Sequence, residues 1–160
     1  MFFQVSILFY ILLVLSWIDV DMGVVPSGII IFGIIIGFSL LILKNGFYIL
    51  PNIYGAGVGF LLVVISGLLG KLLFKKEAIG GGDLYLTTML GLYLGWKYII
   101  TAYFLSFLIA GFYSLYLIIK LKKLPIGHEI KLVPFLSLGG ILGLTIGDKI
   151  NNFYLENFIM

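Results

Sequence analysis

The sequence predicts an all-α, polytopic membrane protein, built as a bundle of about six transmembrane helices. Of the 160 residues, 62% are hydrophobic and only 11% are charged, a balance outside the range of soluble globular domains. The apolar residues form long runs rather than alternating with polar ones. The chain contains no linker and no low-complexity tract, so residues 1–160 are predicted to form a single domain in the lipid bilayer.

Six apolar runs mark the expected helices, with boundaries set to within several residues. The longer runs approach the roughly 20 residues that a helix needs to cross the hydrocarbon core. The fourth and sixth runs are shorter than the others. The runs cover residues 2–18, 24–43, 49–69, 84–95, 98–119 and 132–146.

The breaks between the runs carry residues that favour turns. Lys44-Asn45-Gly46 is a turn signal, and Gly95-Trp96-Lys97 predicts a tight helical hairpin with an interfacial tryptophan. Pro134 suits the first turn of the last helix, where its missing N–H costs nothing. Glycines four positions apart within the runs predict close helix packing. These pairs are Gly33 and Gly37, Gly55 and Gly59, Gly91 and Gly95, and Gly139 and Gly143.

The distribution of lysine predicts the orientation in the membrane. The breaks after the first, third and fifth helices fall on one side of the membrane, and the remaining breaks fall on the other. The first side holds Lys71, Lys75, Lys76, Lys120, Lys122, Lys123 and Lys131, and the second holds Lys44, Lys97 and Lys149. The positive-inside rule therefore places the first side in the cytoplasm, together with Asp19, Asp21 and Asp83.

The composition excludes several classes of function. The chain has no cysteine, which excludes disulfides, thiolate catalysis and cysteine-bound zinc. Its basic excess comes from lysine alone, without a soluble domain or a basic patch interleaved with aromatic residues, so nucleic-acid binding is not expected. The single histidine, His128, lies in a lysine-rich loop and is interpreted as solvated.

Asp19 and Asp83 stand at the edges of apolar runs in a chain that otherwise avoids charge. Inserting a carboxylate to the depth of the membrane costs roughly 3 kcal/mol of free energy. Such a residue is therefore taken as a candidate functional residue by default. Two close carboxyl groups share one proton, and such a pair can hydrolyse a peptide bond without a metal or a cofactor. The alternative is that each aspartate caps a helix end, which suits Asp83 at a helix N-terminus. Spacing alone leaves both interpretations open.

Gly80-Gly81-Gly82 precedes Asp83 directly. Three glycines expose backbone N–H and C=O groups, against which an extended substrate chain could lie, and they leave room beside the carboxyl group. A flexible loop is the alternative. The stretch is not a phosphate-binding P-loop, because Gly-Lys-Ser or Gly-Lys-Thr does not follow it.

Asp21 has two interpretations. Its spacing from Asp19 points the two side chains to nearly opposite faces of a helix, so a solvated or capping role is favoured. Asp19, Asp21 and Asp83 could nevertheless chelate magnesium, as in a metal-dependent membrane phosphotransferase. A third hypothesis is a membrane scaffold without enzymatic activity.

Three elements of the sequence resemble the prepilin peptidases, which are GxGD-type aspartic proteases of the membrane, and the related archaeal preflagellin peptidases. The resemblance covers nearly the whole chain, and the order and spacing of the elements make it specific. The elements are Trp17-Ile18-Asp19 followed by Pro26, Gly80-Gly81-Gly82-Asp83, and Pro134-Phe135 with Gly139-Gly140.

The resemblance implies that Asp19 and Asp83 are the catalytic pair of an aspartic endopeptidase of the cell membrane. Gly80, Gly81, Gly82 and Pro134 are the expected substrate-binding residues. The implied substrates are type IV prepilin-like, pseudopilin or archaellin-like precursors, whose short basic leader is removed at the cytoplasmic face.

The sequence departs from the family pattern at two positions. Tyr85 stands where many bacterial relatives carry lysine, and Ser27 stands where asparagine or aspartate often follows the proline. Both departures concern substrate preference and proton affinity more than the type of reaction. Larger bacterial members have a cysteine-bearing cytoplasmic region linked to N-methylation. Since this chain has no cysteine, we expect protease activity without a methyltransferase domain.

Overall fold

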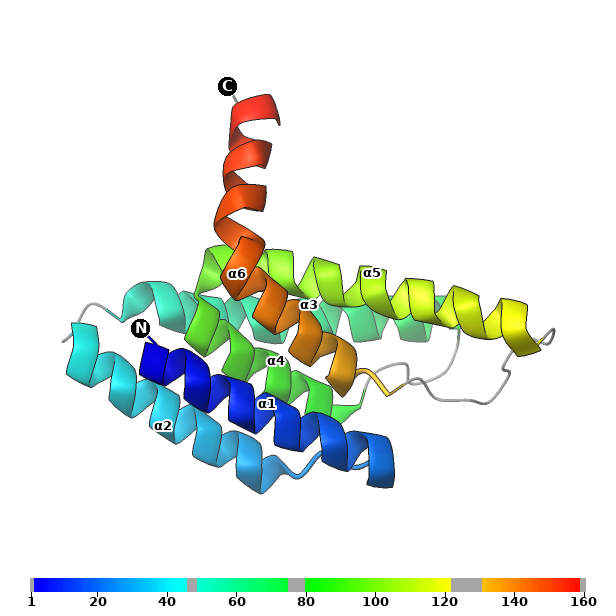
Figure 1. Cartoon of the computed structure of the whole chain (residues 1–160), viewed down its shortest axis with the longest axis horizontal. Coiled ribbons are helices and arrows are strands. Elements are labelled where there is room, and N and C mark those ends of the chain that lie inside the picture. The colour runs from blue at the N-terminus through cyan, green and yellow to red at the C-terminus, as the bar shows by residue number, and fades with distance from the viewer. Residues whose placement is uncertain (1, 46–48, 75–79, 122–130, 159–160) are drawn as a thin grey trace.

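The computed structural model describes residues 2–45, 49–74, 80–121 and 131–158. This part of the chain forms six α-helices and no strand, which confirms the all-α prediction (Figure 1). The last helix extends further than its apolar run predicted, and Figure 1 shows its C-terminal half turning away from the bundle. The helices are α1 (Phe2–Met22), α2 (Ser27–Asn45), α3 (Leu50–Phe74), α4 (Gly81–Leu94), α5 (Trp96–Leu121) and α6 (Val133–Phe158).

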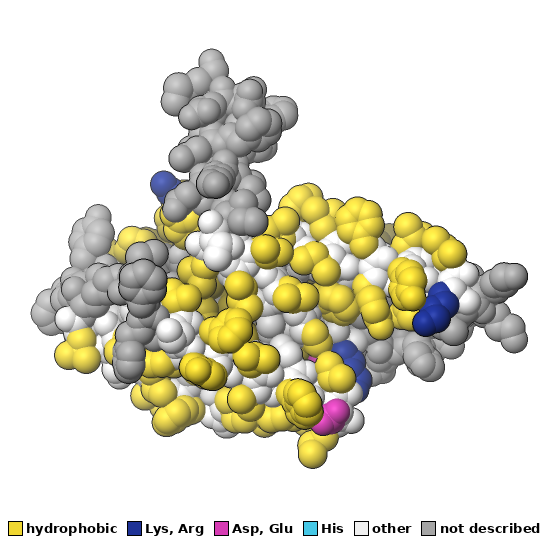
Figure 2. Space-filling view, viewed as in Figure 1, with side chains coloured by type: hydrophobic (Ala, Val, Ile, Leu, Met, Phe, Trp, Pro, Cys, Tyr) yellow, Lys and Arg dark blue, Asp and Glu magenta, His cyan; other side chains and the backbone are white. Residues whose placement is uncertain are grey.

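Three of the described helices are long and apolar enough to span a membrane. They are α1 from Gln4, α3 to Leu73 and α5 to Lys120. Shorter apolar stretches lie in α2 and α6, at Ser27–Leu43 and Val133–Thr145. The face in Figure 2 is covered largely by hydrophobic side chains, which in water would be an unusually large apolar surface. Lipid is the solvent that suits this surface.

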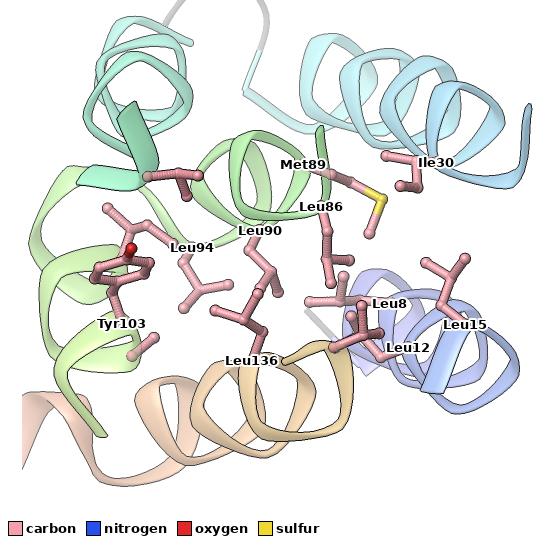
Figure 3. Close-up of a cluster of buried hydrophobic side chains, with 14 residues drawn as sticks. Leu8, Leu12, Leu15, Ile30, Leu86, Met89, Leu90, Leu94, Tyr103 and Leu136 are labelled. Carbon is pink, nitrogen blue, oxygen red and sulfur yellow. The ribbon is translucent and has the colours of Figure 1, made fainter. Parts of the chain in front are cut away.

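Helix α4 lies at the centre of the bundle, in contact with α2, α3, α5 and α6. The side chains of Leu86, Met89 and Leu90 are at most 1% exposed, and they form the middle of the core in Figure 3. Leucines of α1 and α6 reach this core from the other side, including Leu12 and Leu136. With 14 residues, α4 is short for a span, but its neighbours shield it from lipid.

The glycine spacing produces the close helix packing that the sequence predicted. A Cβ atom on Gly91 would lie 2.1 Å from the carbonyl oxygen of Gly55, and one on Gly59 would lie 2.5 Å from that of Thr87. Helices α3 and α4 therefore touch backbone to backbone. On the other side of the bundle, a Cβ atom on Gly139 of α6 would meet the carbonyl oxygen of Ala102 at 2.4 Å.

Two helices end on a glycine in the left-handed region. Gly23 has a φ of 66° and Gly95 a φ of 80°, a conformation that glycine adopts without a Cβ penalty. The Gly95 N–H donates to the Gly91 carbonyl at 2.8 Å, and α5 starts at the next residue, as the predicted hairpin requires. Pro134 lies in the first turn of α6, which confirms its predicted position. The predicted turn after α2 lies partly outside the described residues.

Candidate active site

Asp19 belongs to the last turn of α1, on the face that packs into the bundle. Leu8, Leu12 and Leu15 are at most 1% exposed, and the next position on the same helical face is Asp19, which is 5% exposed. One helical turn earlier, the Ser16 hydroxyl donates to the Ser137 hydroxyl at 2.8 Å and ties α1 to α6. The buried face of α1 therefore continues to Asp19 and places its carboxyl group in the core.

The end of α1 is closed by its own backbone. The N–H of Gly23 donates to the Asp19 carbonyl oxygen at 2.9 Å, which is the hydrogen bond of a left-handed helix cap. This cap stops the helix within one turn of the carboxyl group. Asp19 is therefore held at a helix end rather than in the middle of a membrane span.

Asp83 lies in the first turn of α4, and its carboxyl group accepts from the backbone. The Asp83 N–H donates to the Gly80 carbonyl oxygen at 3.2 Å, and the Gly80 N–H donates toward the Asp83 carboxyl group. An acidic side chain at this position of a helix completes half of a capping box. Asp83 therefore has the capping role that was one of its two predicted interpretations. The hydrogen bond from Gly80 orients the carboxyl group and leaves other acceptor sites of the carboxyl group available.

The tertiary structure brings the two aspartates within electrostatic reach of each other. Asp83 precedes the apolar part of α4 and lies outside the candidate spans. Burial raises the pKa of Asp83 to about 6, and the neighbouring Asp19 also raises it. Among the side chains that Figure 2 colours by type, the acidic ones on the face shown lie near the end of the bundle where α1 ends.

The buried oxygen Oδ2 of Asp19 has no hydrogen-bond partner among the described residues. Buried carboxylate oxygens are normally paired, and one that lacks a partner requires an explanation. A water or a substrate group held between the two carboxyl groups would provide the missing hydrogen bond. This is the place where the sequence predicted that chemistry occurs.

The three glycines before Asp83 have different surroundings. A Cβ atom on Gly82 would lie 2.5 Å from the Cβ of Val25, so packing alone requires glycine there. A Cβ atom on Gly80 would lie 3.8 Å from the Asp83 carboxyl group, and one on Gly81 would meet nothing within 4 Å. Gly81 leaves open backbone where an extended substrate could lie. The substrate-binding roles of these glycines and of Pro134 stay predictions.

The N-terminus of α6 contributes to the site in a way that the sequence analysis missed. The backbone N–H of Val133 donates toward the Asp19 carboxyl group, and Lys131 interacts with it electrostatically. The Lys131 ammonium also donates to the carbonyl oxygen of Val20 at 2.5 Å. Lys131 had been counted only as a marker of orientation. The available signal was Pro134, which predicted a helix N-terminus on the membrane side that is also predicted for Asp19.

Asp21 does not join the pair. It is exposed, whereas Asp19 is buried, as the helical spacing predicted. Within the described ranges, no three acidic or histidine side chains are grouped so that they could hold a metal ion. The three-aspartate cluster of the phosphotransferase hypothesis is therefore not formed. His128 lies outside the described residues.

A helical membrane bundle that brings two aspartates together at one end has the arrangement expected of a membrane aspartic protease. The sequence model of the type IV leader peptidase family matches residues 6–115, and the chain belongs to this family. The matched range contains Asp19, Asp83 and the three glycines, and it ends before Lys131 and Pro134.

The chain is similar to several proteins named prepilin leader peptidase/N-methyltransferase. It is 32% identical to the protein of Aeromonas hydrophila over 96% of this chain and 52% of the relative. It is 30% identical to that of Stutzerimonas stutzeri over 91% and 50%, and 25% identical to that of Bacillus subtilis over 96% and 60%. The chain thus spans about half the length of the first two relatives. No solved structure matches it.

Proposed function

We propose that the protein is an integral membrane aspartic endopeptidase that cleaves the leader peptide of type IV prepilin-like or archaellin-like precursors. Asp19 and Asp83 are its catalytic pair. One observation carries the proposal: two aspartates far apart in sequence lie within electrostatic reach of each other at one end of an apolar bundle, and Oδ2 of Asp19 has no hydrogen-bond partner in the described part of the chain. Membership of the type IV leader peptidase family supports the same activity.

The reaction needs one ionised and one neutral carboxyl group. The carboxylate takes a proton from water as the water oxygen bonds to the scissile carbonyl carbon, and the neutral acid gives its proton to the carbonyl oxygen. The tetrahedral intermediate then collapses. The first aspartate protonates the leaving nitrogen as the C–N bond breaks, and the second recovers a proton from a hydroxyl group of the intermediate. No covalent intermediate with the enzyme forms.

The site faces the cytoplasm in this proposal. The lysines on the side of Asp19 and Asp83 outnumber those on the opposite side, and the positive-inside rule assigns the richer side to the cytoplasm. A precursor with a short basic leader and an apolar helix would place its cleavage site at this level, with the helix in the bilayer. The open backbone at Gly81 would hold the extended segment around the scissile bond.

The peptidase activity is proposed for residues 1–160 without methyltransferase activity. The relatives carry both names, and the chain matches about half of each of the first two. The region that family resemblance links to methylation contains paired cysteines, and this sequence contains none. Incubation of the purified protein with a prepilin-like precursor, followed by the mass of the mature product, tests both points. Cleavage without a methyl group is the expected result.

Chelation should separate the peptidase from the phosphotransferase. Adding an excess of EDTA to the precursor assay is expected to leave the rate of leader cleavage unchanged, because two carboxyl groups and water suffice for the reaction. The rate is measured from the mature product over time, with and without EDTA. A loss of cleavage that magnesium restores would contradict the carboxyl-pair mechanism and favour a metal-dependent one.

The rate of cleavage should fall as the pH rises above about 6. The pKa of Asp83 is raised to about 6, so its neutral form persists to a higher pH than in an ordinary aspartate and is lost above that value. Above it, kcat/KM should decrease about tenfold per pH unit. Initial rates between pH 5 and pH 9 measure this dependence. A rate that stays constant to pH 9 would mean that no carboxyl proton is required.

A further inference from the structure

The end of α1 is held by a lysine from the segment that leads into α6. The Lys131 ammonium donates to the carbonyl oxygen of Val20 at 2.5 Å, across 111 positions of sequence. Its Cε and Nζ atoms also pass 3.8 Å from the place where a Cβ atom would stand on Gly23. Val20 follows Asp19 directly. The contact therefore fixes an exposed cation beside the turn that carries a buried carboxyl group.

Charged and polar groups act on Asp19 from two neighbouring elements, α4 and the start of α6. Asp83 faces it from α4, and Lys131 and the Val133 N–H face it from the start of α6. Asp21 on the same helix is exposed. Among the described residues, Lys131 is the cation that acts on the Asp19 carboxyl group.

The two carboxyl groups of the pair therefore have unequal surroundings. Burial disfavours a negative charge on both groups, but at Asp19 an ammonium group and the N-terminus of a 26-residue helix oppose this effect. Asp83 has the Gly80 N–H and the N-terminus of α4, but the second carboxyl group is its charged neighbour and no cation balances it within the described residues. When the pair shares one proton, this asymmetry decides which oxygen atoms carry it.

We propose that Lys131 is a positioning residue that keeps Asp19 ionised, so that Asp19 is the base and Asp83 the acid of the resting pair. This inference rests on the proposed peptidase function. The Asp19 carboxylate takes the proton of the attacking water, and the neutral Asp83 protonates the carbonyl oxygen. Collapse of the tetrahedral intermediate returns both groups to their starting protonation states, so Lys131 favours the same arrangement in every cycle without exchanging a proton itself.

Replacement of Lys131 tests the assignment through the pH dependence of cleavage. In Lys131→Gln, the acid limb of the profile of kcat/KM against pH should move upward by about one unit, because the base loses its cation. On the acid side of the optimum, kcat should fall about tenfold, with KM unchanged. Lys131→Arg should keep the wild-type profile. Lys120→Gln, which removes a lysine of the same membrane side beside Tyr116, should also keep it.

A chemical rescue adds a second measurement in one protein. Because the chain has no cysteine, Lys131→Cys introduces a single thiol at an exposed position. Alkylation with bromoethylamine restores an ammonium group, and alkylation with iodoacetamide adds a neutral group of similar size. The first product should recover the wild-type acid limb and the second should not. This comparison also decides the question if Lys131→Gln does not fold.

Several results would overturn the assignment of Lys131. An acid limb that coincides with that of the wild type in Lys131→Gln would do so, as would an equal loss in Lys131→Arg or in Lys120→Gln. Equal activity of the two alkylated proteins would have the same meaning. These failures differ from failure of the proposed function, which would appear as cleavage retained by Asp19→Asn. If Asp19→Asn is inactive and Lys131→Gln is unchanged, the peptidase stands and the role of Lys131 does not.

Discussion

Replacing either aspartate of the pair by asparagine is expected to lower the rate of leader cleavage by at least about 10³-fold. Asparagine has the size of aspartate but neither accepts a proton from water nor supplies one at neutral pH. In the proposed mechanism, Asp19→Asn removes the base and Asp83→Asn removes the acid. The measurement is the mass of the product after incubation of a prepilin-like precursor with each purified variant.

The variants should remain folded and in the membrane fraction. Asp19 is buried and its Oδ2 has no hydrogen-bond partner among the residues that the structure describes, so an amide there removes the cost of burying a charge. Thermal unfolding in detergent should show a melting temperature equal to that of the wild type or above it. Asp21→Asn is the matched control, because Asp21 lies on the same helix end but is exposed, and it should cleave at the wild-type rate. Cleavage retained by either active-site variant would refute the pair.

A single methyl group on Gly91 is expected to destabilise the bundle by about 3 kcal/mol or more. In Gly91→Ala, the new Cβ would lie 2.1 Å from the carbonyl oxygen of Gly55, and backbone atoms cannot turn aside as a flexible side chain can. Helices α3 and α4 would have to separate. Since α4 carries Asp83, the separation should also reduce cleavage. Thermal unfolding and the yield of folded protein in mild detergent measure the effect.

Gly57→Ala is the matched control for this packing prediction. Gly57 lies on the same helix as Gly55, two positions further, and a Cβ atom there would meet nothing within 4 Å. Alanine favours a helix over glycine by about 1 kcal/mol, so this variant should be as stable as the wild type or more stable. Equal stability of Gly91→Ala and Gly57→Ala would show that α3 and α4 do not touch at these glycines.

Both predictions concern features that the sequence indicated only in part. The small-residue spacing at Gly55 and Gly91 predicted that helices approach closely, but it did not say that these two glycines face each other. The pairing depends on how α3 and α4 are rotated about their axes. In the same way, the 14-residue α4 was predicted as a short transmembrane segment, and only the packing of its neighbours shows that it lies at the centre of the core.

Asp19 and Asp83 could be selected as candidates from the sequence, because charge is rare in an apolar chain and six predicted crossings put both on one membrane side. The exclusion of Asp21 followed from helical geometry alone. Lys131 could not be found in this way. Its hydrogen bond to Val20 joins residues that are 111 positions apart in the sequence. The chain has ten lysines, and no sequence pattern distinguishes Lys131 from the others.

The amino-acid sequence by itself determined the helical membrane class and the number of helices, and it predicted that the two acids lie on one side of the membrane. These properties follow from local apolar runs, turn residues and the order of crossings. Only the tertiary structure decided which groups surround each acid: the start of α6 against Asp19, and the Gly80 backbone beside Asp83. Such contacts arise when helices distant in sequence pack at a particular rotation, and the apolar period of a single helix does not contain that information.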